Sequence, residues 1–329
     1  MQPPRFVLLT ALAAGLLGLL PGCSKDKEAA PVEPAAPARI SVPQAAVHPE
    51  GIQYDAINKR FIVSSRTKGV INTVRDDSTF TLLADDPRLI STIGVHLDAS
   101  RNRVLVAVAD NGANTARSGP AATSTTLRKL AAVAIFNATS GALVNFVDLG
   151  GLRPGVNHFA NDIAVDNDGN AYVTDSFAPI VYKVTVQGVA SVFLENPQLS
   201  GGTGFGLNGI VYHPDGYLLV AKTSTGTLYK VPIANPAGFT TVANAPGLSL
   251  TGADGLLLAD PQTLLVVSGS QSTVYRLSST DAWANVRAMG TFATGAVSAT
   301  TITKRGNDAF VLYPYTATSP RFRIVKATF

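Results

Sequence analysis

Six segments of the 329-residue chain share one pattern: an apolar strand, a polar turn and a second apolar strand. Consecutive segments begin 43, 68, 47, 46 and 44 residues apart. A period in the mid-forties built on strand hairpins is typical of β-propeller blades, each of which has four antiparallel strands. The first residues of the six segments, in chain order, are Glu50, Ile93, Asn161, Asn208, Asp254 and Ser298.

The outer strands repeat as well, and the last repeat is incomplete. The stretches "IVYKV", "TLYKV" and "TVYRL" follow the third, fourth and fifth hairpins, but the chain ends after the third strand of the sixth repeat, "RFRIVKA". An open edge there would favour aggregation, and "RISV", residues 39–42, could fill it. We therefore expect an all-β fold over residues 39–329, a six-bladed β-propeller closed by an N-terminal strand, with residues 39–44 beside residues 321–328.

The first 22 residues form a leader. Arg5 precedes fifteen apolar residues, 6–20, fewer than the roughly 20 that a membrane span requires. The following "LPGC" ends in Cys23, the only cysteine, and resembles the lipobox of bacterial lipoproteins. The resemblance implies that Cys23 carries lipid and that Ser24 directs the protein to the outer membrane. A secretory signal with an incidental cysteine is the alternative.

Residues 23–38 are rich in Pro, Ala and charged residues and have no periodicity, so we expect a disordered tether. The expected location is then the bacterial cell envelope, with membrane contact through the N-terminal lipid anchor only. A formal net charge of +4 is too small and too scattered to indicate a nucleic-acid partner.

The stretch "FANDIAVDNDGNAYVTDS", residues 159–176, looks at first like a calcium loop. An EF-hand loop places glycine sixth and glutamate twelfth. Counted from Asp166, Gly169 comes two residues too early and the twelfth residue is Phe177. The "DNDGN" core therefore predicts a hairpin turn, and Asn161 needs another explanation.

Equivalent positions at the start of inner strands lie at one height around a propeller channel. Four of the six first residues carry hard oxygen atoms that suit calcium, and no His or Cys at this level favours zinc or copper. The repeats thus predict a site for Ca²⁺, or another divalent cation; polar residues that merely solvate the channel are the alternative. The predicted metal ligands are Glu50, Asn161, Asn208 and Asp254.

The "PEG", "ND", "NG" and "DG" residues at these strand starts resemble the SMP-30/gluconolactonase family, and more distantly the paraoxonases and strictosidine-synthase-like proteins. The similarity covers residues 39–329. It implies a calcium-dependent lactonase in which the same four residues bind the metal and Asp254 also acts as the base. The family's Arg and Asn substrate pair has no counterpart in the second repeat, where Ile93, Val95 and His96 stand, so a sugar lactone is not implied.

Residues near the expected mouth could complete an active site. Asp110, Asp175 and Lys222 end second strands and are predicted to contact substrate. His48 and His158 precede ligand positions by two and three residues, and we assign His158 a catalytic role in proton transfer; a hydrogen-bonded wall histidine is the alternative. Residues 111–129, inserted in the second repeat, could form a substrate lid or a passive surface loop.

Two functions follow from these features. The first is a calcium-dependent hydrolase of a small-molecule lactone or related ester, in which the metal polarises the carbonyl and activates water. No "GxSxG" elbow is present, which disfavours a covalent serine mechanism. The alternative is a non-catalytic propeller scaffold of the NHL type, which binds a ligand or protein partner at the cell envelope.

Overall fold

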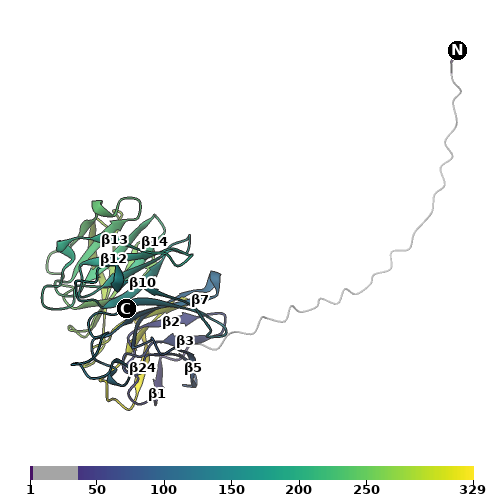
Figure 1. The fold of residues 1–329 in the computed structure, drawn as a ribbon. Helices are drawn as coiled ribbons and strands as arrows, with labels where there is room; N and C mark the ends of the chain where they lie inside the picture. Colours follow the sequence, from purple (N-terminus) through teal and green to yellow (C-terminus); the bar gives the residue numbers. More distant parts are fainter. Residues whose placement is uncertain (3–35) are drawn as a thin grey trace, which may run out of the picture. The chain divides into compact units, whose positions relative to one another are not determined.

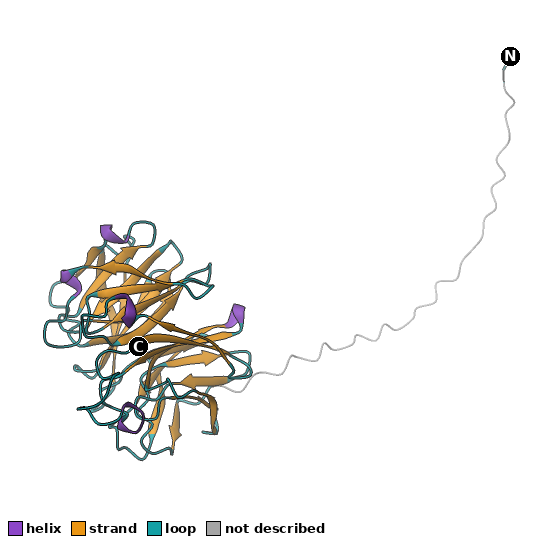
Figure 2. Cartoon of the chain, viewed as in Figure 1, coloured by secondary structure: helices purple, strands orange, loops and turns teal. Residues whose placement is uncertain are grey.

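The computed structural model describes residues 1–2 and 36–329, and it consists almost entirely of β-structure (Figure 2). These residues form 24 strands, one short α-helix, α1 (Thr115–Ser118), and four 3₁₀ helices. None of the helices in this part is long and apolar enough to cross a membrane. The predictions for Cys23, the leader and most of the tether lie outside the described residues.

The strands are grouped in sets of four that follow one another along the chain, and each set is antiparallel. The first two sets are β2 (Ile52–Asp55), β3 (Arg60–Val63), β4 (Val70–Val74) and β5 (Phe80–Asp85), then β6 (Ser91–Asp98), β7 (Arg103–Ala109), β8 (Ala131–Asn137) and β9 (Leu143–Asp148). Next come β10 (Ala160–Val165), β11 (Ala171–Asp175), β12 (Ile180–Val184) and β13 (Ala190–Glu195).

The remaining sets complete the domain. They are β14 (Leu207–His213), β15 (Tyr217–Lys222), β16 (Thr227–Pro232) and β17 (Thr240–Asn244), then β18 (Ala253–Asp260), β19 (Thr263–Ser268), β20 (Thr273–Ser278) and β21 (Asn285–Ala293). The outer strands β17 and β21 pair in parallel, which joins these two sets into one eight-stranded sheet.

The last set is β22 (Ile302–Arg305), β23 (Asp308–Tyr313) and β24 (Phe322–Ala327), with β1 (Arg39–Val42) as its fourth strand. Arg39 pairs with Val325 and Val42 with Phe322 in an antiparallel ladder, and Figure 1 shows β1 beside β24. The predicted closure by the N-terminal strand is therefore confirmed. Without β1, the outer edge of this sheet would present unpaired backbone groups.

The hydrophobic core lies between successive sheets. One cluster joins Ile135 and Val133 of β8 to Val173 and Tyr182 of the next sheet, and four other clusters bridge the other successive pairs in the same way. The first and last sheets also meet, because the Phe61 and Phe310 rings lie 5.3 Å apart. The sheets thus surround a central axis, as in a β-propeller.

The predicted "DNDGN" turn joins β10 and β11. The Asp166 carboxylate accepts a 2.8 Å hydrogen bond from the backbone N–H of Asn170 and a 3.0 Å bond from the Tyr172 hydroxyl. Gly169 has φ +88°, a conformation that glycine adopts without steric cost. The oxygens of this stretch stabilise their own hairpin, so the hairpin prediction is confirmed.

Candidate functional site

A cavity of about 210 Å³ lies among the inner strands of the sheets. The structure brings all four predicted ligands to its lining, each from a different set of strands; we call Glu50, Asn161, Asn208 and Asp254 the oxygen ring. Asn161 and Asn208 are buried, and the two carboxylates are partly exposed. The structure thus supports the predicted convergence, and the role of these residues as ligands stays a prediction.

The two ring asparagines are held by hydroxyl groups from their own sheets. Asn161 Nδ2 donates to Ser176 Oγ at 2.8 Å, and Asn208 Nδ2 donates to Thr223 Oγ1 at 3.0 Å. Each hydroxyl donates in turn to the strand beside it: Ser176 to the carbonyl of Leu207 and Thr223 to that of Ala253. Because the amide nitrogens are engaged, the amide oxygens are left for a ligand.

A support position recurs in the repeats. Its backbone N–H donates to the carbonyl of the residue two before the ring residue, which is true of Ser176, Thr223 and Arg66. The side chain at this position contacts the ring residue of its own sheet, so Arg66 forms an ion pair with Glu50, with Nη1 3.5 Å from Oε2. The sequence reasoning missed Arg66, whose spacing of 16 residues from Glu50 is one longer than the 15 of the other two pairs.

Asp254 lacks such support. Gly269 stands 15 residues after it, and a β-carbon at Gly269 would lie 2.7 Å from the backbone oxygen of Ala299. Counted by this spacing, the fourth ring residue has no side chain at the support position of its own sheet. Its carboxylate is the ring group that a support residue constrains least.

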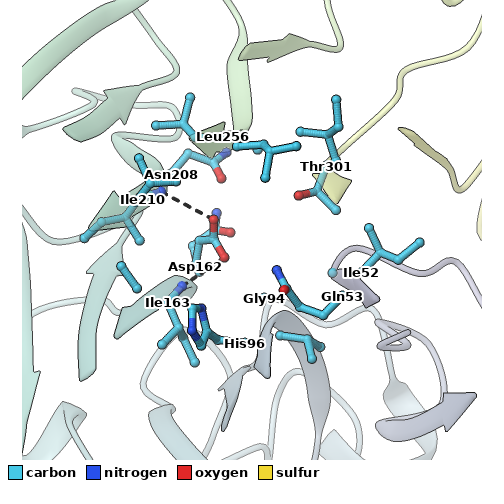
Figure 3. Close-up of a pocket in the computed structure, with 18 of the residues that line it drawn as sticks. Ile52, Gln53, Gly94, His96, Asp162, Ile163, Asn208, Ile210, Leu256 and Thr301 are labelled. Atoms are coloured by element: carbon cyan, nitrogen blue, oxygen red, sulfur yellow. Dashed lines mark hydrogen bonds between the residues drawn. The ribbon is translucent and has the colours of Figure 1, made fainter. Parts of the chain in front are cut away.

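Asp162 is a cavity residue that the sequence reasoning did not single out. Figure 3 shows its carboxylate pointing into the cavity, and the backbone N–H of Ile210 donates to it at 3.4 Å. The equivalent residues of four other repeats are glycines, and a β-carbon on Gly209 would lie 2.2 Å from the Asp254 carbonyl oxygen. A carboxylate in a place where other inner strands require glycine was a signal available in the sequence.

The three carboxyl groups of the cavity have raised pKa values, because burial disfavours their charged forms and little positive charge lies nearby. Burial raises the pKa of Glu50, against the opposing effect of the Arg66 guanidinium. Burial, with a smaller contribution from Glu50, raises the pKa of Asp162 to about 7. Burial and then the charges of Glu50 and Asp162 raise the pKa of Asp254. A bound cation would reverse these shifts by stabilising the charged forms.

The donor set fits calcium. It offers two carboxylates and two amides, all hard oxygen ligands, and Glu50 Oε2 is buried without a hydrogen-bond partner. No group of three or more His, Cys, Asp or Glu residues in residues 36–329 is arranged to hold a metal. Any metal at the ring would therefore depend on the amide oxygens as well as the carboxylates.

The structure places His158 away from the cavity. Its Nδ1 lies 2.8 Å from Asp175 Oδ2 and 3.1 Å from the Tyr182 hydroxyl, and its Nε2 lies 2.9 Å from the Arg153 carbonyl oxygen. Burial opposes the charge on His158, but Asp175 and the carbonyl of Arg153 raise its pKa above the ordinary value. Both ring nitrogens are engaged, so His158 and Asp175 are positioned as a buried ion pair and not beside the oxygen ring.

His48 is differently placed. It lies near Arg66, whose backbone N–H donates to its carbonyl, and its Nδ1 has no partner among the described residues. Burial and the charge of Arg66 lower the pKa of His48 to about 4. A histidine at this position is therefore neutral at physiological pH.

The other predicted substrate residues do not line the cavity. Asp110 is fully buried and accepts hydrogen bonds from the Gly112 N–H and the Thr126 hydroxyl. It thereby fixes both ends of the 111–129 insertion. Lys222 Nζ donates to the carbonyl of Gln198 at 2.9 Å. These contacts are structural, and a substrate role for Asp110 and Lys222 stays a prediction that this cavity does not support.

The insertion itself is anchored to neighbouring loops. Arg117 Nη1 donates to the carbonyls of Gly69 and Leu89, and Arg117 Nη2 pairs with Asp85 at 2.7 Å. Asn114 Nδ2 donates to the carbonyl of Ile90 at 2.6 Å. These anchors favour the surface-insertion alternative over a mobile lid.

Comparison with known proteins shows the fold only. The Malassezia sympodialis allergen Mala s 1 superposes with a TM-score of 0.68 at 17% identity, over 89% of this chain and 97% of that one. A gluconolactonase from Xanthomonas campestris gives 0.58 at 16% identity, over 88% and 89%. Virginiamycin B lyase from Staphylococcus aureus gives 0.56 at 12% identity, over 88% and 98%.

No family model matches the sequence, and no curated protein matches it significantly. The structural likeness places the chain among β-propeller proteins, and these neighbours include a gluconolactonase, a luciferin-regenerating enzyme and a virginiamycin B lyase. At these identities the likeness extends to architecture and not to activity.

Proposed function

We propose that the chain is a six-bladed β-propeller hydrolase that binds calcium in the oxygen ring and cleaves a lactone or related ester. The observation that carries the proposal is the convergence of four oxygen-bearing side chains, from four different sets of strands, on one cavity. In this interpretation each set of four strands is a blade, and the eight-stranded sheet is two blades joined by β17 and β21.

The ring residues would hold the ion in complementary ways. Glu50 and Asp254 supply the two negative charges, and Asn161 and Asn208 supply neutral oxygens that Ser176 and Thr223 orient. When bound, calcium polarises a substrate carbonyl and stabilises the oxyanion that forms as water attacks. Other divalent cations that prefer oxygen ligands suit the same set.

Asp254 is the residue we assign to accepting the proton of the attacking water. It has no support residue in its own sheet, and a carboxylate that ligates through one oxygen keeps the other for a proton. His158 does not share this role, because both its ring nitrogens are engaged outside the cavity. Asp254 lines the cavity, and we assign it the role of base there.

Hydrolysis of a panel of lactones and aryl esters, measured with calcium and with a chelator, tests the proposal. We expect turnover of at least one substrate class that the chelator abolishes and added calcium restores. Calorimetric titration of the chelated protein should show calcium binding that Glu50→Ala removes. Absence of binding at millimolar calcium, or chelator-resistant turnover, would contradict the calcium mechanism and favour the scaffold function.

We also propose that Cys23 carries lipid and anchors the protein in the cell envelope, on the support of the leader and "LPGC" in the sequence. Expression of Cys23→Ser in a Gram-negative host should move the protein from the membrane fraction to the soluble fraction. Identical fractionation of the variant and the wild type would contradict the anchor.

A further inference from the structure

The Glu50 side of the oxygen ring contains three buried polar atoms that have no hydrogen-bond partner among the described residues. These atoms are His48 Nδ1, Glu50 Oε2 and Arg66 Nε. The other support residues bond their ring partners closely, at 2.8 Å for Ser176 and 3.0 Å for Thr223. Arg66 and Glu50 instead stand 3.5 Å apart, beyond the roughly 2.7–2.9 Å of a close charge-assisted bond.

Buried groups without partners carry a desolvation cost that is normally avoided. The three residues are neighbours, because Arg66 pairs with Glu50 and its backbone N–H donates to the carbonyl of His48. Together their unpartnered atoms indicate a place where a ligand supplies the missing partners. Glu50 Oε2 requires a donor or a cation, whereas the guanidinium N–H of Arg66 requires an acceptor. A cation bound at Glu50 together with an anionic oxygen bound at Arg66 would supply both, and it would balance the charges of the two residues.

Arg66 is suited to the second of these. A guanidinium presents planar donors that match a carboxylate. Arg66 does not line the cavity itself, but its ion-pair partner Glu50 does, and 22% of the Arg66 side chain is exposed. Glu50 is its ion-pair partner in the structure. A cation that binds Glu50 would weaken this pair by competing for the same charge, and Arg66 would then be left with unused donors.

We propose that Arg66 recognises a carboxylate of the substrate. Until a divalent cation binds to Glu50, the ion pair with Glu50 occupies the Arg66 guanidinium. The proposal rests on the proposed function and narrows its substrate class to lactones or esters that carry a carboxylate. Each ligand then favours binding of the other. The cation draws Glu50 away from Arg66, which leaves Arg66 free to bind the anion, and the anion draws Arg66 away from Glu50, which leaves Glu50 free to bind the cation.

Calorimetric calcium titrations of the wild type, Arg66→Gln and Arg66→Lys, in sodium chloride and in sodium acetate of equal ionic strength, test this inference. Acetate is the carboxylate probe. In chloride, Arg66→Gln should bind calcium about tenfold more tightly, because no guanidinium competes for Glu50. Acetate should raise the calcium affinity of the wild type, raise that of Arg66→Lys less, and leave that of Arg66→Gln unchanged.

Arg128→Gln is the matched control. Arg128 is exposed, and its guanidinium lies 4.6 Å from the centre of the Phe177 ring, so this variant should respond as the wild type does. Equal calcium affinity of Arg66→Gln and the wild type in chloride would show that Arg66 does not compete with calcium for Glu50, and would overturn that part of the proposal. Absence of an acetate effect on the wild type would overturn carboxylate recognition. A wild type that binds no calcium would overturn the proposed function itself, and with it this extension.

Discussion

The oxygen ring and the His158 cluster, formed by His158, Asp175 and Tyr182, both bury titratable side chains near inner strands of the same domain. In the His158 cluster each ring nitrogen and the Tyr182 hydroxyl has a hydrogen-bond partner. In the ring, Glu50 Oε2 has no close hydrogen bond among the described residues and only a 3.5 Å ion pair with Arg66, and the residues line an open cavity. Buried charge with close hydrogen-bond partners stabilises a fold, whereas weakly paired charge that faces a cavity indicates a ligand.

The largest expected effect is a loss of folding stability when the Asp175 carboxylate of the His158 cluster is replaced. Asp175→Asn leaves the buried His158 without its counter-charge, which typically costs about 3–5 kcal/mol. Chemical denaturation should show this loss in the free energy of unfolding, while calcium affinity stays at the wild-type value. A variant as stable as the wild type, or one that has lost calcium binding, would break the distinction between the two regions.

Asp254→Asn should have the opposite effects, a loss of calcium binding and activity without a loss of stability. It keeps the size and one oxygen but leaves the ion with one protein charge from the ring, so we expect no measurable hydrolysis. Calcium affinity should fall by at least about tenfold, the minimum typical when a residue that merely orients a ligand is removed. Metal-free stability should stay equal or rise, because Asp254 lies near two other carboxylates. A large loss of metal-free stability would show that the ring is structural.

Ser176→Ala should sharpen the comparison further, with a smaller effect. Removal of the hydroxyl frees the Asn161 amide to rotate, so calcium affinity should fall by about tenfold. Titration calorimetry measures the change, and Ser140→Ala, in an exposed turn, is the control. Unchanged affinity in Ser176→Ala would show that the support position does not orient the ring.

The smallest effect concerns pH. The raised pKa of His158 means that its proton stabilises the fold fully below the unfolded value of about 6.5, and that this stabilisation is lost as the pH rises through the folded value. The difference in unfolding free energy between the wild type and Asp175→Asn should therefore shrink at alkaline pH. A difference that is constant with pH would show that His158 is not charged in the folded state.

The sequence predicted the hairpin repeats, the closing strand and the convergence of the ring, because all three follow from periodicity and strand pairing. It misplaced His158 for a geometric reason. His158 and Asn161 are an odd number of residues apart, and side chains alternate along an extended chain, so proximity in sequence did not place them on one face. The bulge between Ala160 and Ile163 obscures the alternation further.

Arg66 was missed for another reason. Strand register sets which ring residue Arg66 contacts. The equivalent positions carry two hydroxyl residues and a glycine, none of which resembles an arginine: Ser176, Thr223 and Gly269. No shared residue type marks the position, so it becomes visible only when the backbone hydrogen bonds are known.

The pairing of β1 with β24 has a consequence for how the chain folds. A strand at the start of the domain finds its partner among the last residues, so this contact spans nearly the whole chain. Contacts of such high sequence separation close late and slow the folding of β-proteins. The ring of sheets therefore cannot be completed until β24 has been synthesised, and a chain that lacks β24 would leave β1 and β23 with unpaired edges open to aggregation.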